Sequence, residues 1–164
     1  KKLAKYAGIN YLDRNSINDA DSISLNDIMM KSLQIIESNG DFPDSLLYVN
    51  FDYVERPKYI FDKLITDAQY NGFDTIFPGL IDYGHYWHYA DEKYSQTDPS
   101  LKPREKREPI YKAPYGQGCL SAAWNIRRGK MVSGKVGILK LSDSSLISMS
   151  GDTPTSEIDS PDGR

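Results

Sequence analysis

Two segments place apolar side chains at the spacing of an amphipathic helix. In the first, Ser24 is a suitable N-cap and Asn39-Gly40 a suitable end. The apolar residues that share one face are Leu25, Ile28, Met29, Leu33 and Ile36. In the second, Pro57 is expected to open the helix and Asn71-Gly72 to close it. Its expected buried positions are Ile60, Leu64, Ile65 and Ala68.

Short apolar runs alternate with these helices. Residues 45–49 and 73–80 read as buried strands, and residues 120–126 and 136–141 read as strands further along the chain. Strands that alternate with helices predict βαβ units. The expected fold is therefore α/β with a mostly parallel sheet.

The pattern changes over about residues 82–114. Residues 83–94 hold four Tyr, two His and Trp87, and a mixed-charge run follows at 102–108. We interpret this segment as an excursion from the sheet, such as a flap or a dimerisation arm. Two alternatives are a metal site and carbohydrate stacking. The metal site would use Asp82, His85, His88 and Asp91; the stacking residues would be Tyr83, Tyr86 and Trp87.

Composition narrows the class of protein. The 164 residues suit one domain, with 39% hydrophobic and 26% charged residues. The net charge of -3 argues against nucleic acid as a partner. The single cysteine excludes an internal disulfide and fits a reducing compartment. No apolar run reaches the roughly 18–20 residues that span a bilayer, so we predict a cytoplasmic protein without a membrane partner.

Candidate chemistry follows the strand at 45–49. Asn50, Asp52 and Arg56 supply an amide, an acid and a guanidinium just before a helix. Ligands of open α/β sheets bind beyond the carboxyl ends of strands, and a helix N-terminus beside an arginine suits an anion. The alternative is a polar turn in which Arg56 pairs with Glu55 or Asp52.

A second candidate lies in the Gly-Gln-Gly segment at 116–118. Glycines let the backbone approach a ligand closely, and Gln117 can donate to and accept from a sugar or base. A Gly-x-Gly pattern alone is a weak signal, and an ordinary turn is the simpler explanation. Cys119 invites comparison with a nucleophile, but we expect a small buried residue at the start of a strand.

Near the end of the sequence, Glu157 and Asp159 flank Ile158. On a strand both carboxylates would lie on one face, where they could bind Mg²⁺. The alternative is a surface strand with solvated acids.

Several segments in this order resemble the acylneuraminate cytidylyltransferase family, which makes CMP-activated acidic sugars. They are Asp-Ala-Asp-Ser at 19–22, Arg-Pro-Lys-Tyr-Ile at 56–60, Phe-Asp-Thr-Ile-Phe at 73–77, Tyr-Gly-Gln-Gly-Cys at 115–119, Gly-Lys-Val-Gly-Ile at 134–138 and Glu-Ile-Asp-Ser at 157–160. The similarity spans nearly all of the chain and rests on the order and spacing of these motifs.

The resemblance implies a Rossmann-like nucleotide-diphospho-sugar transferase fold, a three-layer sandwich. The implied reaction transfers CMP from CTP to an acidic, sialic-acid-like (nonulosonate) sugar and releases pyrophosphate. Glu157 and Asp159 would hold Mg²⁺, and Arg56 and Asp159 would be catalytic. The implied substrate-binding residues are Asn50, Asp52, Gln117, Lys135 and Ser22. Independently of the resemblance, the aromatic segment at 83–94 suggests a homodimer.

Two departures from the family pattern shape the expectation. The family's triphosphate-binding loop has no counterpart, so the chain is expected to be N-terminally incomplete and inactive with CTP by itself. The loop at 50–54 reads Asn-Phe-Asp-Tyr-Val where the family usually has Gln-Pro-Thr-Ser-Pro. Two alternatives remain, namely a noncatalytic sugar- or nucleotide-binding module and a glycosyltransferase that uses nucleotide sugars.

Overall fold

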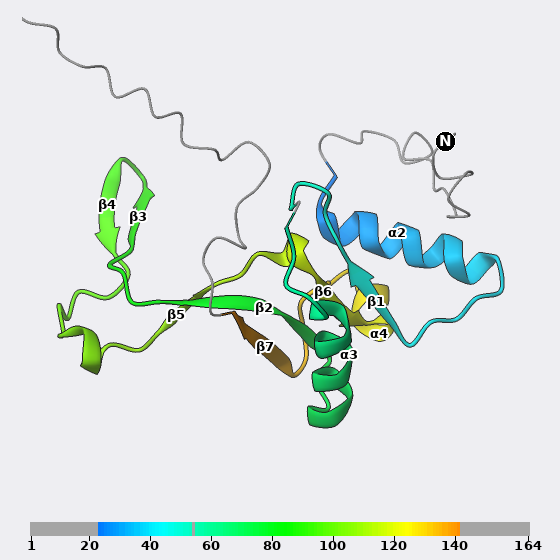
Figure 1. Ribbon diagram of the computed structural model, residues 1–164. Coiled ribbons are helices and arrows are strands. Elements are labelled where there is room, and N and C mark those ends of the chain that lie inside the picture. Colours follow the sequence, from blue (N-terminus) through cyan, green and yellow to red (C-terminus); the bar gives the residue numbers. More distant parts are fainter. Residues whose placement is uncertain (1–22, 54, 142–164) are drawn as a thin grey trace, which may run out of the picture.

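A five-stranded mixed sheet forms the centre of the computed structural model, which describes residues 23–53 and 55–141. The strands run in the order β1-β6-β2-β5, and β7 pairs with β2 (Figure 1). These strands are β1 (Ser45–Tyr48), β2 (Thr75–Asp82), β5 (Ile110–Lys112), β6 (Cys119–Ala122) and β7 (Val136–Leu141). The helices are α2 (Leu25–Ser38), α3 (Ile60–Asn71) and α4 (Ala123–Arg127), with short 3-10 turns η2 (Arg104–Lys106) and η3 (Tyr115–Gln117).

The directions of the strands correct one prediction. β6 is antiparallel to both β1 and β2, β5 is antiparallel to β2, and only the β2–β7 pair is parallel. The expected mostly parallel sheet was therefore wrong, although the α/β class is confirmed. β1 and β2 do run in the same direction on either side of β6, as a βαβ unit requires. Hydrophobic pattern identifies a strand, but it does not reveal that a later strand inserts between two earlier ones.

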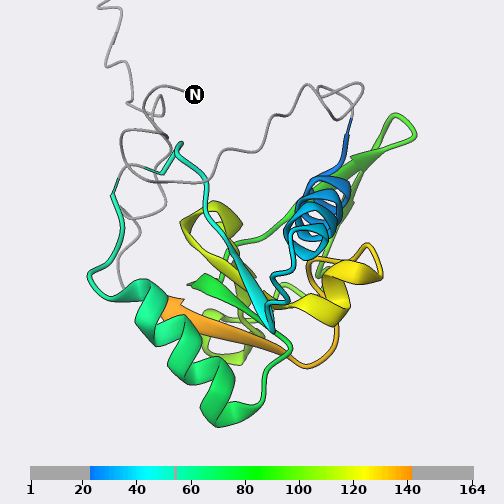
Figure 2. The ribbon, with the colours of Figure 1, turned by 90° about the vertical axis from the view of Figure 1, so that its right-hand side faces the viewer.

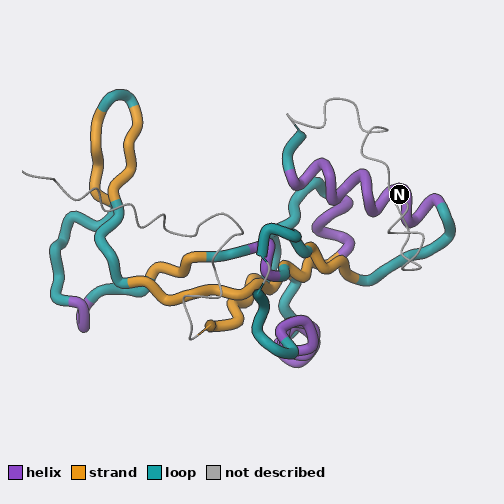
Figure 3. Tube along the Cα trace, turned by 45° about the horizontal axis from the view of Figure 1, so that its top comes forward, coloured by secondary structure: helices purple, strands orange, loops and turns teal. Residues whose placement is uncertain are grey.

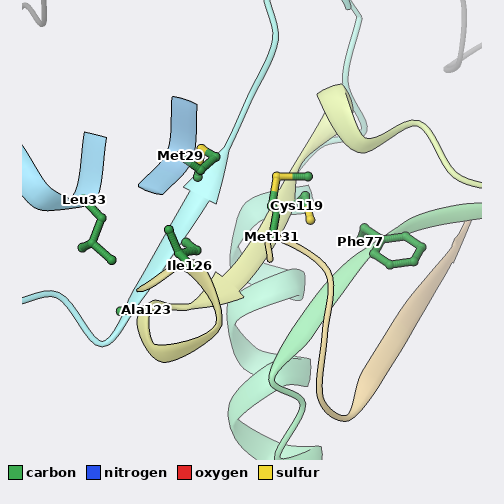
Figure 4. Packing of buried hydrophobic residues seen from close by; sticks show 7 residues of the cluster. All are labelled: Met29, Leu33, Phe77, Cys119, Ala123, Ile126 and Met131. Carbon is green, nitrogen blue, oxygen red and sulfur yellow. The ribbon is translucent and has the colours of Figure 1, made fainter. Parts of the chain in front are cut away.

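Helices cover both faces of the sheet. Because side chains alternate along a strand, Phe77 and Cys119 face one side, while Ile76 and Leu120 face the other. The first side packs against α2 and α4, and the second packs against α3. Figure 2 shows α2 and α3 on opposite sides of the strands. Figure 4 shows the first cluster, in which Met29 and Leu33 of α2 face Ile126 of α4.

The helix predictions hold with two corrections, the exposure of Ile65 and the start of α3. Ile65 was expected to be buried but has an exposed fraction of 40%. α2 begins after Ser24, whose Oγ accepts a hydrogen bond from the Asp27 amide at 3.2 Å. α3 ends at Gly72, which adopts a left-handed conformation with φ of 63°. It begins at Ile60 rather than at Pro57, because Tyr59 also has a positive φ of 60° and interrupts the helical backbone.

The segment 120–126 was predicted as one strand, and this was wrong. It forms the end of β6 and then most of the five-residue helix α4. Asn125 of α4 donates to the Ser133 carbonyl at 3.0 Å, which ties the helix to the chain before β7. The predicted strand at 136–141 is confirmed as β7.

The excursion between β2 and β5 contains a separate hairpin. β3 (Trp87–Ala90) and β4 (Lys93–Gln96) pair only with each other, and Asp91 and Glu92 form the turn with positive φ values of 50° and 61°. The hairpin projects away from the helices and the central sheet (Figure 3).

Candidate functional site

The loop between β1 and α3 contains three of the candidate residues, and it has an ordered internal structure. Asn50 Nδ2 donates to Asp52 Oδ2 at 2.8 Å, and the Asp52 amide donates back to Asn50 Oδ1 at 3.2 Å. This side-chain turn is typical of Asn at the start of a tight loop. It directs the chain from the end of β1 toward Arg56.

Arg56 is half-buried and lies four residues before Ile60, the first residue of α3. Its guanidinium donates to the Asn50 carbonyl, and its Nε is buried without a hydrogen-bond partner. Within the residues that the structure describes, Arg56 forms no ion pair with a carboxylate. The structure therefore contradicts the alternative in which Arg56 pairs with Glu55 or Asp52.

The segment before β6 packs against this loop. The Asn50 amide donates to the Gly116 carbonyl at 2.9 Å, and Gln117 Nε2 donates to the Glu55 carbonyl at 2.9 Å. Gln117 is fully buried, with an exposed fraction of 0%. Asn50, Asp52, Arg56 and Gln117 thus come together in one place, at the carboxyl end of β1.

Gly116 permits the close approach of these two segments. A Cβ at this position would lie 2.7 Å from Tyr53 Cδ2 and 2.8 Å from Asn50 Cβ, closer than real contacts allow. Sequence reasoning singled out the glycine but missed Tyr53, whose ring covers it. An aromatic residue within the predicted loop was the available signal.

The electrostatics of the site extend to Tyr48 at the end of β1. Burial raises the pKa of Tyr48 above its usual value, and the nearby Asp52 carboxylate raises it further. The Tyr48 hydroxyl is therefore neutral at physiological pH. It is a neutral hydroxyl close to the Asp52 carboxylate.

Lys135, the remaining described candidate, lies away from the loop that follows β1. It precedes β7, whose first residue pairs with the first residue of β2, while the 50–56 loop follows the last residue of β1. Because β1 and β2 run in the same direction, these positions are at opposite ends of the sheet. Lys135 Nζ donates to the Asn71 carbonyl at 2.7 Å, at the end of α3.

Ser22, Glu157 and Asp159 lie outside the described residues. Their roles, and that of Mg²⁺ at Glu157 and Asp159, stay predictions.

The alternative metal site in the excursion does not form. The described ranges contain no group of three or more His, Cys, Asp or Glu residues arranged to bind a metal. Asp82 instead accepts hydrogen bonds from the Tyr86 hydroxyl and the Gly84 amide, which lower its pKa, the Tyr86 bond most. His85 Nδ1 lies 3.3 Å from the side-chain nitrogen of Gln96.

Cys119 is a structural residue, as expected. It is the first residue of β6 and has an exposed fraction of 0%. Burial raises the pKa of its thiol to about 12. A thiol with such a pKa is not a nucleophile at neutral pH.

Two hollows occur in the described structure away from Arg56. One of about 280 Å³ lies at the end of β2 and is lined by Ile81, Asp82, Tyr83, Gly84 and Arg104. The other, of about 390 Å³, lies between α3 and the start of β1 and includes Asp44, Ile65 and Phe73 in its lining.

No protein-family model matches this sequence, and no curated protein matches it significantly. Among the described residues, none of the helices has the length and apolar character needed to cross a membrane.

Proposed function

We propose that this protein is a nucleotidyltransferase that transfers CMP from CTP to an acidic, nonulosonate-type sugar. The observation that carries the proposal is the position of Arg56. It is a guanidinium without a carboxylate partner among the described residues, held beyond the carboxyl end of β1 and four residues before the first residue of α3. This is the part of an α/β sheet where anionic ligands bind.

In the proposed reaction, the anomeric hydroxyl oxygen of the sugar attacks the α-phosphorus of CTP. The bond from that phosphorus to the bridging oxygen breaks, pyrophosphate leaves with the electron pair of that bond, and the hydroxyl proton passes to solvent water. Arg56 binds the phosphate oxygens and stabilises the negative charge that grows on them. Mg²⁺, when bound by Glu157 and Asp159, would neutralise triphosphate charge. Lys135 has no part in this step, because it lies at the other end of the sheet.

The sequence motifs support the class of substrate. The order of the motifs resembles the acylneuraminate cytidylyltransferase family, and helices cover both faces of the sheet, as in a layered α/β fold. The proposed partners are CTP and the acidic sugar.

One observation favours the second candidate, a noncatalytic nucleotide- or sugar-binding module. The side chains of Asn50 and Gln117 form hydrogen bonds within the site itself. Groups committed in this way leave fewer donors for a substrate than a catalytic site would use.

The deciding experiment measures pyrophosphate release by the natural protein with CTP, Mg²⁺ and a panel of nonulosonic acids. We expect activity that falls at least about 100-fold in Asp159→Ala and in Arg56→Met, as for other groups that stabilise transition-state charge. Lys135→Met is the matched control, and it should retain activity. A folded protein that binds CTP and releases no pyrophosphate with any sugar would favour the binding module.

A further inference from the structure

The way in which Gln117 is bonded indicates a role different from substrate contact. Its side chain is fully buried, and its amide nitrogen donates to the Glu55 carbonyl at 2.9 Å. A side chain with an exposed fraction of 0% cannot touch a dissolved ligand unless the loop above it opens. Glu55, which accepts this hydrogen bond, directly precedes Arg56 in the sequence.

The same loop is held to the same segment at a second point. The Asn50 amide donates to the Gly116 carbonyl at 2.9 Å, one residue from Gln117, and the Asn50 carbonyl accepts from the Arg56 guanidinium. The backbone of the loop is thus fixed near both of its ends by residues 116 and 117. The Arg56 guanidinium is hydrogen-bonded to Asn50, the first of these fixed residues. Arg56 also directly follows Glu55, the second of them.

We infer that Gln117 is a positioning residue: its buried amide holds residues 50–53 and 55–56 in the conformation that presents the Arg56 guanidinium to an anionic substrate. The inference rests on the proposed function for the identity of that substrate. It assigns Gln117 an action through Arg56, in place of the direct sugar contact expected from the sequence.

The substitution Gln117→Glu makes the role measurable through pH. A protonated glutamic acid can still donate to the Glu55 carbonyl, whereas a carboxylate cannot donate and repels that oxygen. Burial raises the pKa of such a carboxyl group above its ordinary value of about 4.3, so the switch falls within a range of about pH 5 to pH 8. Gln117→Met, which has no donor at any pH, and Gln34→Glu, on the exposed face of α2, are the controls.

Two readouts are needed. The first is the hydrogen-exchange protection of the Asn50 amide, which reports the loop without any ligand. We expect this protection to decrease in Gln117→Glu as the pH rises, to be low in Gln117→Met at every pH, and to be unchanged in Gln34→Glu. The second is the affinity for CTP with Mg²⁺, which should decrease about threefold to tenfold over the same pH range in Gln117→Glu, as the loss of one hydrogen bond implies.

The Arg56→Met background tests whether Gln117 acts through Arg56. If it does, Gln117→Glu has no further effect on CTP affinity once Arg56 is absent. Additive losses would overturn the inference, as would unchanged protection of Asn50 in Gln117→Glu. Global unfolding of Gln117→Glu at the pH at which the loop opens would also overturn it, since Gln117 would then be merely structural.

The outcomes separate this inference from the proposed function. If Arg56→Met leaves CTP affinity unchanged, the proposed role of Arg56 fails. The exchange of the Asn50 amide then decides by itself whether Gln117 holds the loop.

Discussion

At the scale of single residues, Gly116 is the tightest point of the candidate site. Alanine at this position would place its Cβ 2.7 Å from Tyr53 Cδ2 and 2.8 Å from Asn50 Cβ. We expect Gly116→Ala to displace the 50–53 loop and to lower the free energy of unfolding by about 1–3 kcal/mol, as for other overpacked positions. Chemical denaturation measures this loss. In Gly116→Ala/Tyr53→Ala the loss should be smaller than the sum of the two single losses, and a simple sum would contradict the contact.

Cys119 gives a prediction for alkaline pH. The pKa of its thiol is about 12 in the folded protein against an ordinary 9.0, so unfolding above pH 9 releases a proton. The contribution of the neutral thiol is complete below that pH and decreases as the pH rises, by about 1.4 kcal/mol per pH unit. Between about pH 8 and pH 10 the unfolding free energy of the protein should therefore decrease by about 1.4 kcal/mol more than that of Cys119→Ala. Denaturant titrations at both pH values measure the difference, and equal losses in the two proteins would contradict a buried thiol.

The residues of the site show what sequence could and could not predict. Asn50, Asp52 and Arg56 were found because they follow a strand and precede a helix, which is a local feature. That Gln117 joins them depends on β1 pairing with β6, since Tyr48 at the end of β1 lies opposite Cys119 at the start of β6. The Gly-Lys-Val-Gly-Ile motif at 134–138 suggested Lys135 as a site residue. Such a motif carries no information about which end of the sheet the residue occupies.

At the scale of elements, the N-terminus of α2 depends on one hydroxyl group. Ser24 Oγ accepts from the Asp27 amide at 3.2 Å, and α2 then covers the sheet with Met29 and Leu33. We expect Ser24→Ala to lower the free energy of unfolding by about 1 kcal/mol, the usual cost of losing an N-cap. Thermal or denaturant unfolding measures the change. Ser24→Thr keeps the hydroxyl acceptor and should lower the free energy of unfolding much less. Equal decreases in both variants would contradict the cap.

Elements with a strong local pattern were predicted well, and those defined by tertiary pairing were not. α2, the end of α3 at Gly72 and β7 follow from caps, glycines and apolar periodicity. The order and direction of the strands follow from β6, which returns between β1 and β2. The apolar run that contains β6 continues into α4 without a break, so the pattern gave no sign of the change from strand to helix.

At the scale of the whole molecule, the β3–β4 hairpin is the least supported part of the described structure. It pairs with no other strand, and a two-stranded hairpin in water is only marginally stable by itself. Trp87, Tyr89 and Tyr94 have exposed fractions of 60%, 59% and 74%. Apolar surface of this kind is stabilised when a second protein surface covers it, and the homodimer expected from the sequence would supply that surface.

We therefore predict a homodimer in which each hairpin packs against the other copy. Trp87→Glu should shift the protein toward the monomer, because a buried, unpaired carboxylate opposes the contact. Analytical ultracentrifugation over a range of protein concentrations measures the dissociation constant. Tyr70→Glu is the matched control, since Tyr70 has an exposed fraction of 88% on α3, and it should leave the dimer intact. A monomer at every concentration, or equal dissociation of the two variants, would contradict this dimer.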